Sequence, residues 1–252
     1  MKIARFSSGE DPQYGIIDGD EIVVLQGDPM FQGFVTTEER VGLASVKLLA
    51  PVIPRSKVVA VGKNYADHAA EMGGVVPERP LLFLKPNTSV IGTGDAIVLP
   101  PDSRQVEHEA ELAIVIGSVA KNVRAEDYAD VIFGYTIAND VTARDLQKLD
   151  GQWARAKGFD TFCPLGPYIE TEFDWRDALI EARVDGELRQ EGNLSEMIFT
   201  IPEIVAYASR AFTLLPGDVI LTGTPAGVSP FSSGQTVDIS IAGLGTLSNR
   251  AR

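Results

Sequence analysis

Short apolar runs separated by turn residues recur along the chain, and this pattern constrains the fold more than any other feature. The runs are KVVAVG, LLFLKP, AIVLP, ELAIVIG, VIFGYTIA, DVILTGTP and TVDISIAG. Strands of this length bounded by Gly, Pro and Asp are typical of β proteins, whereas parallel α/β sheets alternate strands with longer helices. The pattern therefore predicts a mainly β (α+β) fold built as a mixed β-sandwich roll.

Two Asp-Gly pairs lie between alternating apolar runs and predict β-hairpins. Asp18-Gly19 lies within YGIIDGDEIVVL, and Asp185-Gly186 lies within LIEARVDGELRQEG. Asp-Gly favours the tight turn whose twist matches the flanking strands. The first of these hairpins belongs to a small N-terminal β domain, which we place at residues 1–54. Residues 55–252 form the main domain.

Helices are few. One is predicted over residues 201–211, because it begins after Thr200 and has a proline in its first turn. A short helix is predicted after Asn64, which can cap it, and Gly73 can end it.

The charge balance narrows the range of partners. The chain has 22 basic and 35 acidic residues, for a formal charge of −13, and contains no lysine- or arginine-rich run. We therefore do not expect nucleic acids or anionic membranes as partners. We expect a small molecule instead. An acidic protein that binds an anionic substrate must supply positive charge locally, through a metal ion or a few lysine and arginine side chains.

Cysteine and apolar content bear on the compartment. Cys163 is the only cysteine, so an intrachain disulfide is not expected. We find neither a signal-peptide pattern nor a run of about 18 apolar residues, and we therefore expect a cytoplasmic protein.

Two glutamates, Glu109 and Glu111, open the apolar run ELAIVIG. Side chains alternate across a strand, so the two carboxylates project from one face. An ordinary solvated strand face would look the same, but a divalent cation between the carboxylates would relieve their repulsion. The chain has just two histidines, His68 and His108, which favours oxygen ligands and hence Mg²⁺ or Mn²⁺ over a histidine-rich zinc site. His108 points to the opposite face, and we expect it to pack or hydrogen-bond locally.

His68 and Glu71 lie three residues apart in the short predicted helix, so their side chains share one side of it. They could be a solvated surface pair or a functional pair. Spacing alone favours the solvated pair.

Seven separated motifs resemble the fumarylacetoacetate hydrolase family, in particular its small acylpyruvase-like branch. They are VGKNYADHAAEMG, FLKPNT, EHEAELAIVIG, GYTIANDVTARDLQ, WARAKGFDTFCPLGP, DGELRQEG and LTGTPAGV. The resemblance covers residues 57–227 and follows the family's motif order. The N-terminal residues contribute little to it and resemble the short extension of many bacterial members.

The resemblance implies a set of site residues. The metal ligands fall on Glu109, Glu111 and Asp140. His68 and Glu71 become a catalytic dyad on a segment that closes over the substrate, and Gly73, Gly74 and the region of residues 72–79 would form a mobile lid that selects the substrate. Further implied residues are Lys157, which would face substrate oxygens, and the substrate-binding Gln147 and Thr224. We expect Arg144 and Asp145 to pair structurally, and we leave the role of Lys85 open.

The implied activity is a Mg²⁺- or Mn²⁺-dependent cleavage of C–C bonds in short 2-oxo acids through a metal-stabilised enolate, as in an acylpyruvate or fumarylpyruvate hydrolase or an oxaloacetate decarboxylase. The alternative is an isomerase of 2-hydroxyhepta-2,4-diene-1,7-dioate, whose remote carboxylate would require another basic pocket residue. A catalytically silent metal-binding scaffold belongs to a different class. The family resemblance also suggests a homodimer.

Overall fold

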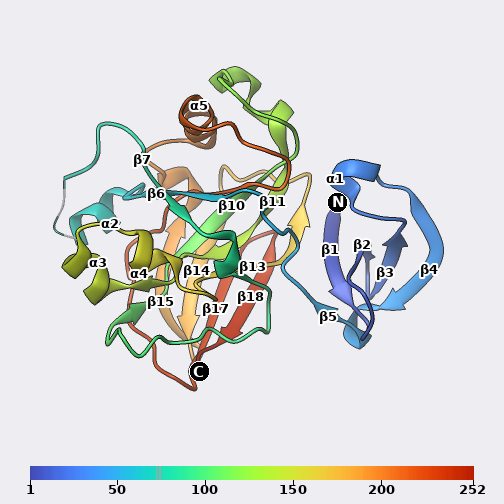
Figure 1. Ribbon diagram of the computed structural model, residues 1–252, viewed down its shortest axis with the longest axis horizontal. Helices are drawn as coiled ribbons and strands as arrows, with labels where there is room; N and C mark the ends of the chain where they lie inside the picture. The colour runs from blue at the N-terminus through green and yellow to red at the C-terminus, as the bar shows by residue number, and fades with distance from the viewer. Residues whose placement is uncertain (72, 74) are drawn as a thin grey trace.

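The structure is a computed structural model that describes residues 1–71, 73 and 75–252. Within these residues, twelve strands form one mixed sheet with the main order β4-β3-β2-β1-β13-β11-β10-β16-β6-β7, and four strands form a second sheet with the order β15-β14-β17-β18. Figure 1 shows β14, β15, β17 and β18 beside the central strands, with α5 above these strands in the view. The predicted mainly β fold is confirmed.

The N-terminal part extends the large sheet. Its elements are β1 (Lys2–Ser7), β2 (Gln13–Asp18), β3 (Glu21–Leu25), α1 (Pro29–Gln32), β4 (Thr36–Gly42) and β5 (Lys47–Leu48). The first predicted hairpin joins β2 to β3, but Asp18 pairs with Glu21, so the loop is Gly19-Asp20. Strand β1 pairs with β13, which connects this part to the rest of the sheet (Figure 1). The predicted division at residue 54 stays a prediction.

The main part contains the remaining strands and helices. Its strands are β6 (Val58–Gly62), β7 (Leu81–Lys85), β8 (Val90–Ile91), β9 (Val106–Glu107), β10 (Ala110–Ile116), β11 (Ile132–Asn139), β12 (Thr142–Ala143), β13 (Cys163–Glu170), β14 (Leu179–Val184), β15 (Glu187–Asn193), β16 (Val219–Leu221), β17 (Thr236–Ile241) and β18 (Gly245–Arg250). Its α-helices are α2 (Ala66–Glu71), α3 (Arg144–Asp150), α4 (Ala154–Gly158) and α5 (Ile201–Ala211).

Strand β10 is buried on both faces. Leu112 and Ile114 join a core cluster that includes residues of α5, β14 and β17. Ala113 and Val115 join a second cluster with residues of β1 and β13. This burial positions the start of β10 rigidly, because side chains in a close-packed core cannot shift independently.

Helix α5 has the predicted bounds and the predicted start. The Thr200 side chain and the Glu203 side chain form a reciprocal capping box there. Such a box satisfies amide groups that otherwise lack a partner in the first turn.

Two local predictions are wrong. AIVLP forms no strand: its amides at Ile97 and Leu99 donate to the carbonyls of Arg250 and Arg252, but in the described residues this pairing extends no further than the isolated bridge between Ile97 and Ala251. Asn64 does not cap α2; its amide donates to the carbonyls of Phe199 and Thr222 and accepts from the Phe199 amide. The residue therefore joins distant segments instead of serving the helix beside it.

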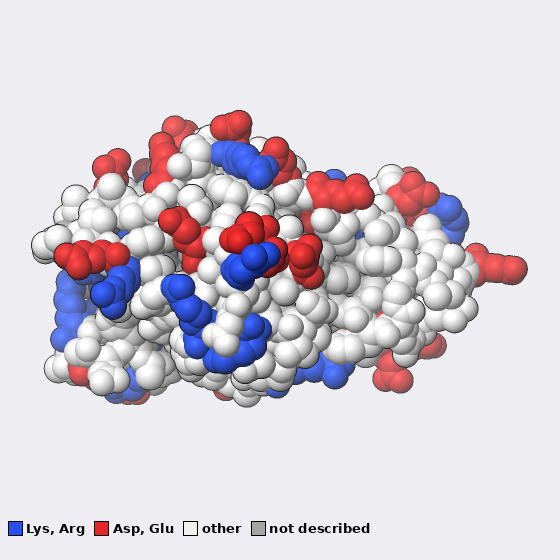
Figure 2. Space-filling view, turned by 90° about the horizontal axis from the view of Figure 1, so that it is seen from above, with Lys and Arg blue, Asp and Glu red and all other residues white. Residues whose placement is uncertain are grey.

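Acidic and basic side chains are interspersed on the face of the molecule in Figure 2. Among the described residues, none of the helices combines the length and the apolar character needed to span a bilayer.

Candidate active site

Three carboxylates meet at one end of the β10–β11 pair. Glu109 directly precedes β10, Glu111 lies within it, and Asp140 directly follows β11. The strands run antiparallel with Ala110 opposite Asn139, so these three positions come together. One carboxylate oxygen from each lies within 4.8 Å of the others, and all three residues are buried. The solvated strand face that spacing alone allowed is therefore wrong.

Basic side chains hold two of these carboxylates. The Lys157 ammonium, on α4, donates to Glu109 Oε2 and Asp140 Oδ2, each at 2.7 Å. Lys85, at the end of β7, donates to Asp140 Oδ1 at 2.5 Å. Arg144 donates to Glu109 and, at 2.7 Å, to Glu107 Oε2. Burial would raise the pKa of Glu109, but Lys157 and Arg144 outweigh it and lower that pKa.

Glu111 has no basic partner within the described residues. Its carboxylate accepts from the Gly223 amide at 2.6 Å, and its side chain is 1% exposed. Burial raises the pKa of Glu111 well above its ordinary value, and repulsion from Asp140 and Glu109 adds to the effect. If Glu111 is ionised, no basic side chain among the described residues forms an ion pair that offsets the cost of burying its negative charge. The three oxygen donors therefore fit a divalent cation such as Mg²⁺ or Mn²⁺.

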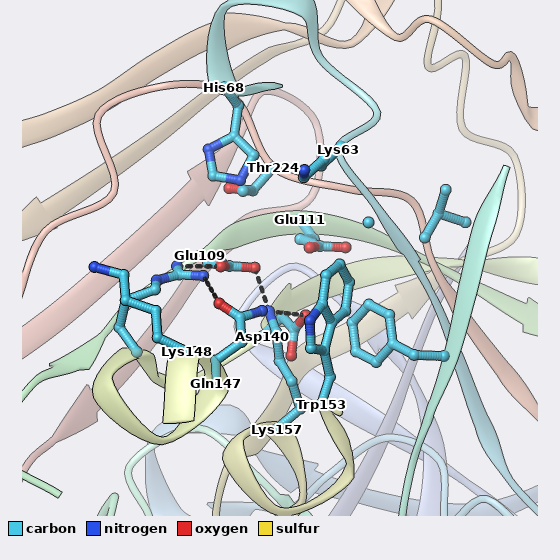
Figure 3. Close-up of a pocket in the computed structure, with 14 residues that line it drawn as sticks. Lys63, His68, Glu109, Glu111, Asp140, Gln147, Lys148, Trp153, Lys157 and Thr224 are labelled. Carbon is cyan, nitrogen blue, oxygen red and sulfur yellow. Dashed lines mark hydrogen bonds and ion pairs between the residues drawn. The ribbon is translucent and has the colours of Figure 1, made fainter. Parts of the chain in front are cut away.

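These carboxylates form the floor of a pocket of about 220 Å³ (Figure 3). Its size suits a small metabolite. The lining residues are Val61, Gly62, Lys63, His68, Phe83, Glu109, Glu111, Asp140, Arg144, Gln147, Lys148, Trp153, Lys157 and Thr224. Of the eight residues predicted for the site, the pocket thus brings seven together, and the eighth, Glu71, contacts one of them.

Helix α2 holds His68 over the pocket. His68 Nδ1 lies 3.2 Å from Glu71 Oε2, and His68 is 5% exposed. Glu71 also accepts from the Gly227 amide at 3.2 Å, which ties the end of the helix to the loop after β16. His68 is therefore not solvated, whereas the Glu71 side chain is 33% exposed. Of the predicted lid, Met72 and Gly74 lie outside the described residues.

The two predicted substrate-binding residues have defined partners. Gln147 Oε1 accepts from Arg144 Nη1 at 2.7 Å. The Thr224 hydroxyl accepts from Gln190 Nε2 at 2.7 Å. Each side chain is thus oriented by a neighbour, while their roles toward a substrate stay predictions.

The expectation for His108 is confirmed, whereas the expected pairing of Arg144 with Asp145 is wrong. His108 packs away from the carboxylates and hydrogen-bonds to Gln190 and Ser229 at 2.9 Å, as expected. Asp145 instead accepts from the Ser103 hydroxyl and the Arg104 amide, because adjacent residues at the start of α3 point in different directions.

The sequence analysis did not assign seven of the lining residues to the site: Val61, Gly62, Lys63, Phe83, Arg144, Lys148 and Trp153. Six of the seven lie within the motifs VGKNYADHAAEMG, FLKPNT, GYTIANDVTARDLQ and WARAKGFDTFCPLGP, and Lys148 directly follows the third of these. The available signal was their closeness to those motifs. Lys85, left open before, lies beneath Asp140 as its ion-pair partner.

Comparisons with known proteins match nearly the whole chain. Residues 57–252 match the family model described as fumarylacetoacetate (FAA) hydrolase C-terminal, and residues 1–51 match the one described as Rv2993c-like, N-terminal. Protein Rv2993c of Mycobacterium tuberculosis is 49% identical, over 99% of this chain and 97% of its own length. Oxaloacetate tautomerase YisK of Bacillus subtilis is 44% identical, over 82% of this chain and 74% of its own.

Solved structures are also similar to this chain over its whole length. A structure titled 5-carboxymethyl-2-hydroxymuconate delta-isomerase, from Mycobacterium smegmatis, is 48% identical with a TM-score of 0.93 and covers 100% of this chain and 99% of that one. Maleylpyruvate hydrolase from Sphingobium, in complex with manganese(II) and pyruvate, is 34% identical with a TM-score of 0.83 and covers 100% of this chain and 98% of that one.

Proposed function

Because the chain belongs to the fumarylacetoacetate hydrolase family, we propose that it is a divalent-metal-dependent enzyme that acts on short 2-oxo acids through an enolate. One observation carries the proposal: three buried carboxylates converge opposite a buried histidine, and one of them, Glu111, has no basic partner in the described part of the chain. The manganese and pyruvate in the maleylpyruvate hydrolase structure support a 2-oxo acid ligand. A silent scaffold would not need the carboxylates and the histidine dyad together.

A divalent cation held by Glu109, Glu111 and Asp140 would act as a Lewis acid toward the 2-oxo oxygen. The Lys157 ammonium lies against Glu109 and Asp140, and Lys157 is 2% exposed, so it would favour negative charge that develops on a nearby substrate oxygen. Burial disfavours the charged ammonium, but Asp140 and Glu109 outweigh this and raise the pKa of Lys157. Lys157 therefore acts as a fixed positive charge in this proposal.

His68 is the proton carrier in this proposal. Glu71 holds Nδ1 of the ring, so Nε2 is the nitrogen that takes a proton from C3 of the substrate and returns it. Gln147 and Thr224 would orient the carboxylate and the oxo group.

We place proton transfer, as in keto–enol tautomerisation or isomerisation, first among the reactions. The names of a 44% identical tautomerase and a 48% identical isomerase structure support it. The second candidate is C–C cleavage by hydrolysis or decarboxylation, which the sequence motifs alone favoured. The 34% identical maleylpyruvate hydrolase supports it. Both share the enolate and differ in what happens at C3 and beyond.

Metal removal followed by a substrate panel tests the proposal. The purified protein should act on at least one of oxaloacetate, acetylpyruvate, fumarylpyruvate and a 2-hydroxyheptadienedioate; a chelator should abolish that activity, and Mg²⁺ or Mn²⁺ should restore it. Asp140→Ala should not be restored, because it lacks a proposed ligand. Full turnover by verified metal-free protein would rule out the proposed site, and inactivity on the whole panel with metal present would rule out the substrate class.

A further inference from the structure

Lys63 is a lysine in an unusual backbone conformation at the pocket. It follows the last residue of β6, and its φ is +57°, in the left-handed region that glycine or asparagine adopts at lower cost. Strained residues of this kind persist where the surrounding structure holds them, and they concentrate at binding sites. The next residue, Asn64, supplies such support through its hydrogen bonds to Phe199 and Thr222. The strained backbone makes the Lys63 side chain a candidate for ligand binding.

That side chain lines the pocket without a carboxylate partner. Lys63 lines the pocket, and in the view of Figure 3 it lies on the side of the carboxylates from which His68 extends. Lys85 and Lys157, the two buried lysines around the site, both form ion pairs with Asp140. In the described part of the chain, no carboxylate oxygen lies within 4.0 Å of the Lys63 ammonium.

The net charge of the buried side chains around the pocket indicates what the Lys63 ammonium would contribute. Four buried carboxylates, including Glu107, face three buried cations around the pocket, which leaves one negative charge. A divalent cation would turn this into one positive charge, which matches the single carboxylate that chelates beside the 2-oxo group. A second carboxylate on the substrate would then need positive charge of its own.

From this geometry we propose that Lys63 binds the second, distal carboxylate of a 2-oxo dicarboxylic acid. The inference rests on the proposed function and narrows its substrate class from 2-oxo acids to those with two carboxylates. A charge-assisted hydrogen bond from a partly buried ammonium is directional and stronger than a neutral one. Lys63 is thus a specificity residue, while Lys157 and the carboxylate triad serve the 2-oxo end shared by all such substrates.

Matched ligand pairs test this inference. Calorimetry on magnesium-saturated protein would compare freshly dissolved oxaloacetate with 2-oxobutanoate, and 2-oxoglutarate with 2-oxopentanoate. Within each pair a methyl group replaces the distal carboxylate. Lys63→Met keeps an unbranched side chain and the same backbone demand, so it should weaken binding of at least one dicarboxylate by about 10- to 100-fold, the range for a hydrogen bond to a charged group. Binding of the methyl analogues should stay unchanged, and Lys63→Arg should retain much of the preference.

Lys148→Met is the matched control, because Lys148 is the other pocket lysine without a carboxylate partner within the described residues, but it is exposed at the rim. It should leave both ligand pairs within about twofold of wild type. Equal weakening of dicarboxylate and methyl analogue in Lys63→Met, an unchanged preference, or a loss confined to Lys148→Met would overturn the inference and leave the proposed function intact. A wild-type protein that binds none of the four acids would instead overturn the proposed function.

Discussion

Glu111 differs from the other buried carboxylates around the pocket in its lack of a basic partner among the described residues. Glu107 contacts Arg144, Glu109 contacts Lys157 and Arg144, and Asp140 contacts Lys85 and Lys157. Among the described residues, the hydrogen-bond partner of the Glu111 carboxylate is the Gly223 amide alone. A Cβ atom on Gly223 would lie 2.6 Å from Asn64 Cβ, and the φ of Gly223 is +96°, so a glycine is needed for this amide to reach the carboxylate.

Glu111→Gln should therefore separate stability from metal binding. In metal-free protein the unfolding free energy should rise by about 1 kcal/mol or more, because a neutral amide is less costly to bury than a carboxylate without a cation. The increase in melting temperature that Mg²⁺ causes in wild type should be lost. Glu107→Gln is the control: it weakens an existing ion pair, so it should lower stability and preserve the response to Mg²⁺. A less stable Glu111→Gln that still responds to Mg²⁺ would contradict this assignment.

At the scale of elements, α2 combines two tasks in six residues. It places His68 in the pocket, and Glu71 fastens its end to Gly227 beyond β16. Because the helix is short, it contributes little stability by itself and depends on such contacts. The catalytic histidine of the proposal is thus positioned by one glutamate.

His68→Ala should lower tautomerisation or hydrolysis by the ~10²–10⁴-fold typical of a lost general acid or base. Decarboxylation of oxaloacetate should fall much less, because carbon dioxide leaves without proton abstraction. Steady-state rates for each reaction would show the difference, and calorimetry should show unchanged Mg²⁺ affinity. Glu71→Gln, which can still accept from Gly227, should show a smaller loss than His68→Ala. An equal fall in all reactions would indicate that His68 positions the substrate.

At the scale of the whole molecule, Asp218 connects distant parts of the chain. Its side chain is fully buried and accepts from the Ser56 hydroxyl at 2.7 Å, the Lys57 ammonium at 2.5 Å and the Leu215 amide at 2.9 Å. It thereby joins the start of β6 to the start of β16, which pair in parallel. Burial would raise the pKa of Asp218, but the hydrogen bonds from Lys57 and Ser56 outweigh it and lower that pKa.

This contact predicts a pH dependence of stability. A carboxyl whose pKa is lower in the folded than in the unfolded protein stabilises the fold above its unfolded pKa of about 3.9, and the contribution disappears as pH falls through the folded pKa. Asp218→Asn should therefore be less stable than wild type by about 3 kcal/mol at pH 7. Urea unfolding of both proteins should show the gap shrink below about pH 4. A gap that stays constant down to pH 3 would mean that charge at this position does not matter.

Much of the architecture could be predicted from the sequence because it depends on neighbouring residues. Alternation along a strand, the Asp185-Gly186 turn and the Thr200–Glu203 cap act over a few residues, so the predicted strands other than AIVLP, the second hairpin and α5 are found in the structure. The same alternation placed Glu109 and Glu111 on one face, and the family motifs supplied the other site residues. The homodimer and the cytoplasmic location stay predictions.

Only the tertiary structure decided which charges meet. Lys85 and Lys157 share Asp140 across sequence separations of 55 and 17 residues, and Arg144 contacts Glu107 and Glu109 instead of its neighbour Asp145. The sequence predicts that Asn64 caps a helix, but its side-chain amide donates hydrogen bonds to the distant carbonyls of Phe199 and Thr222. Local patterns cannot specify such partners, because ion pairs and buried hydrogen bonds depend on which segments the folded core brings together. Within the described residues, Glu111 and Lys63 have no ion-pair partner, and this too follows from the packing and could not be read from the sequence.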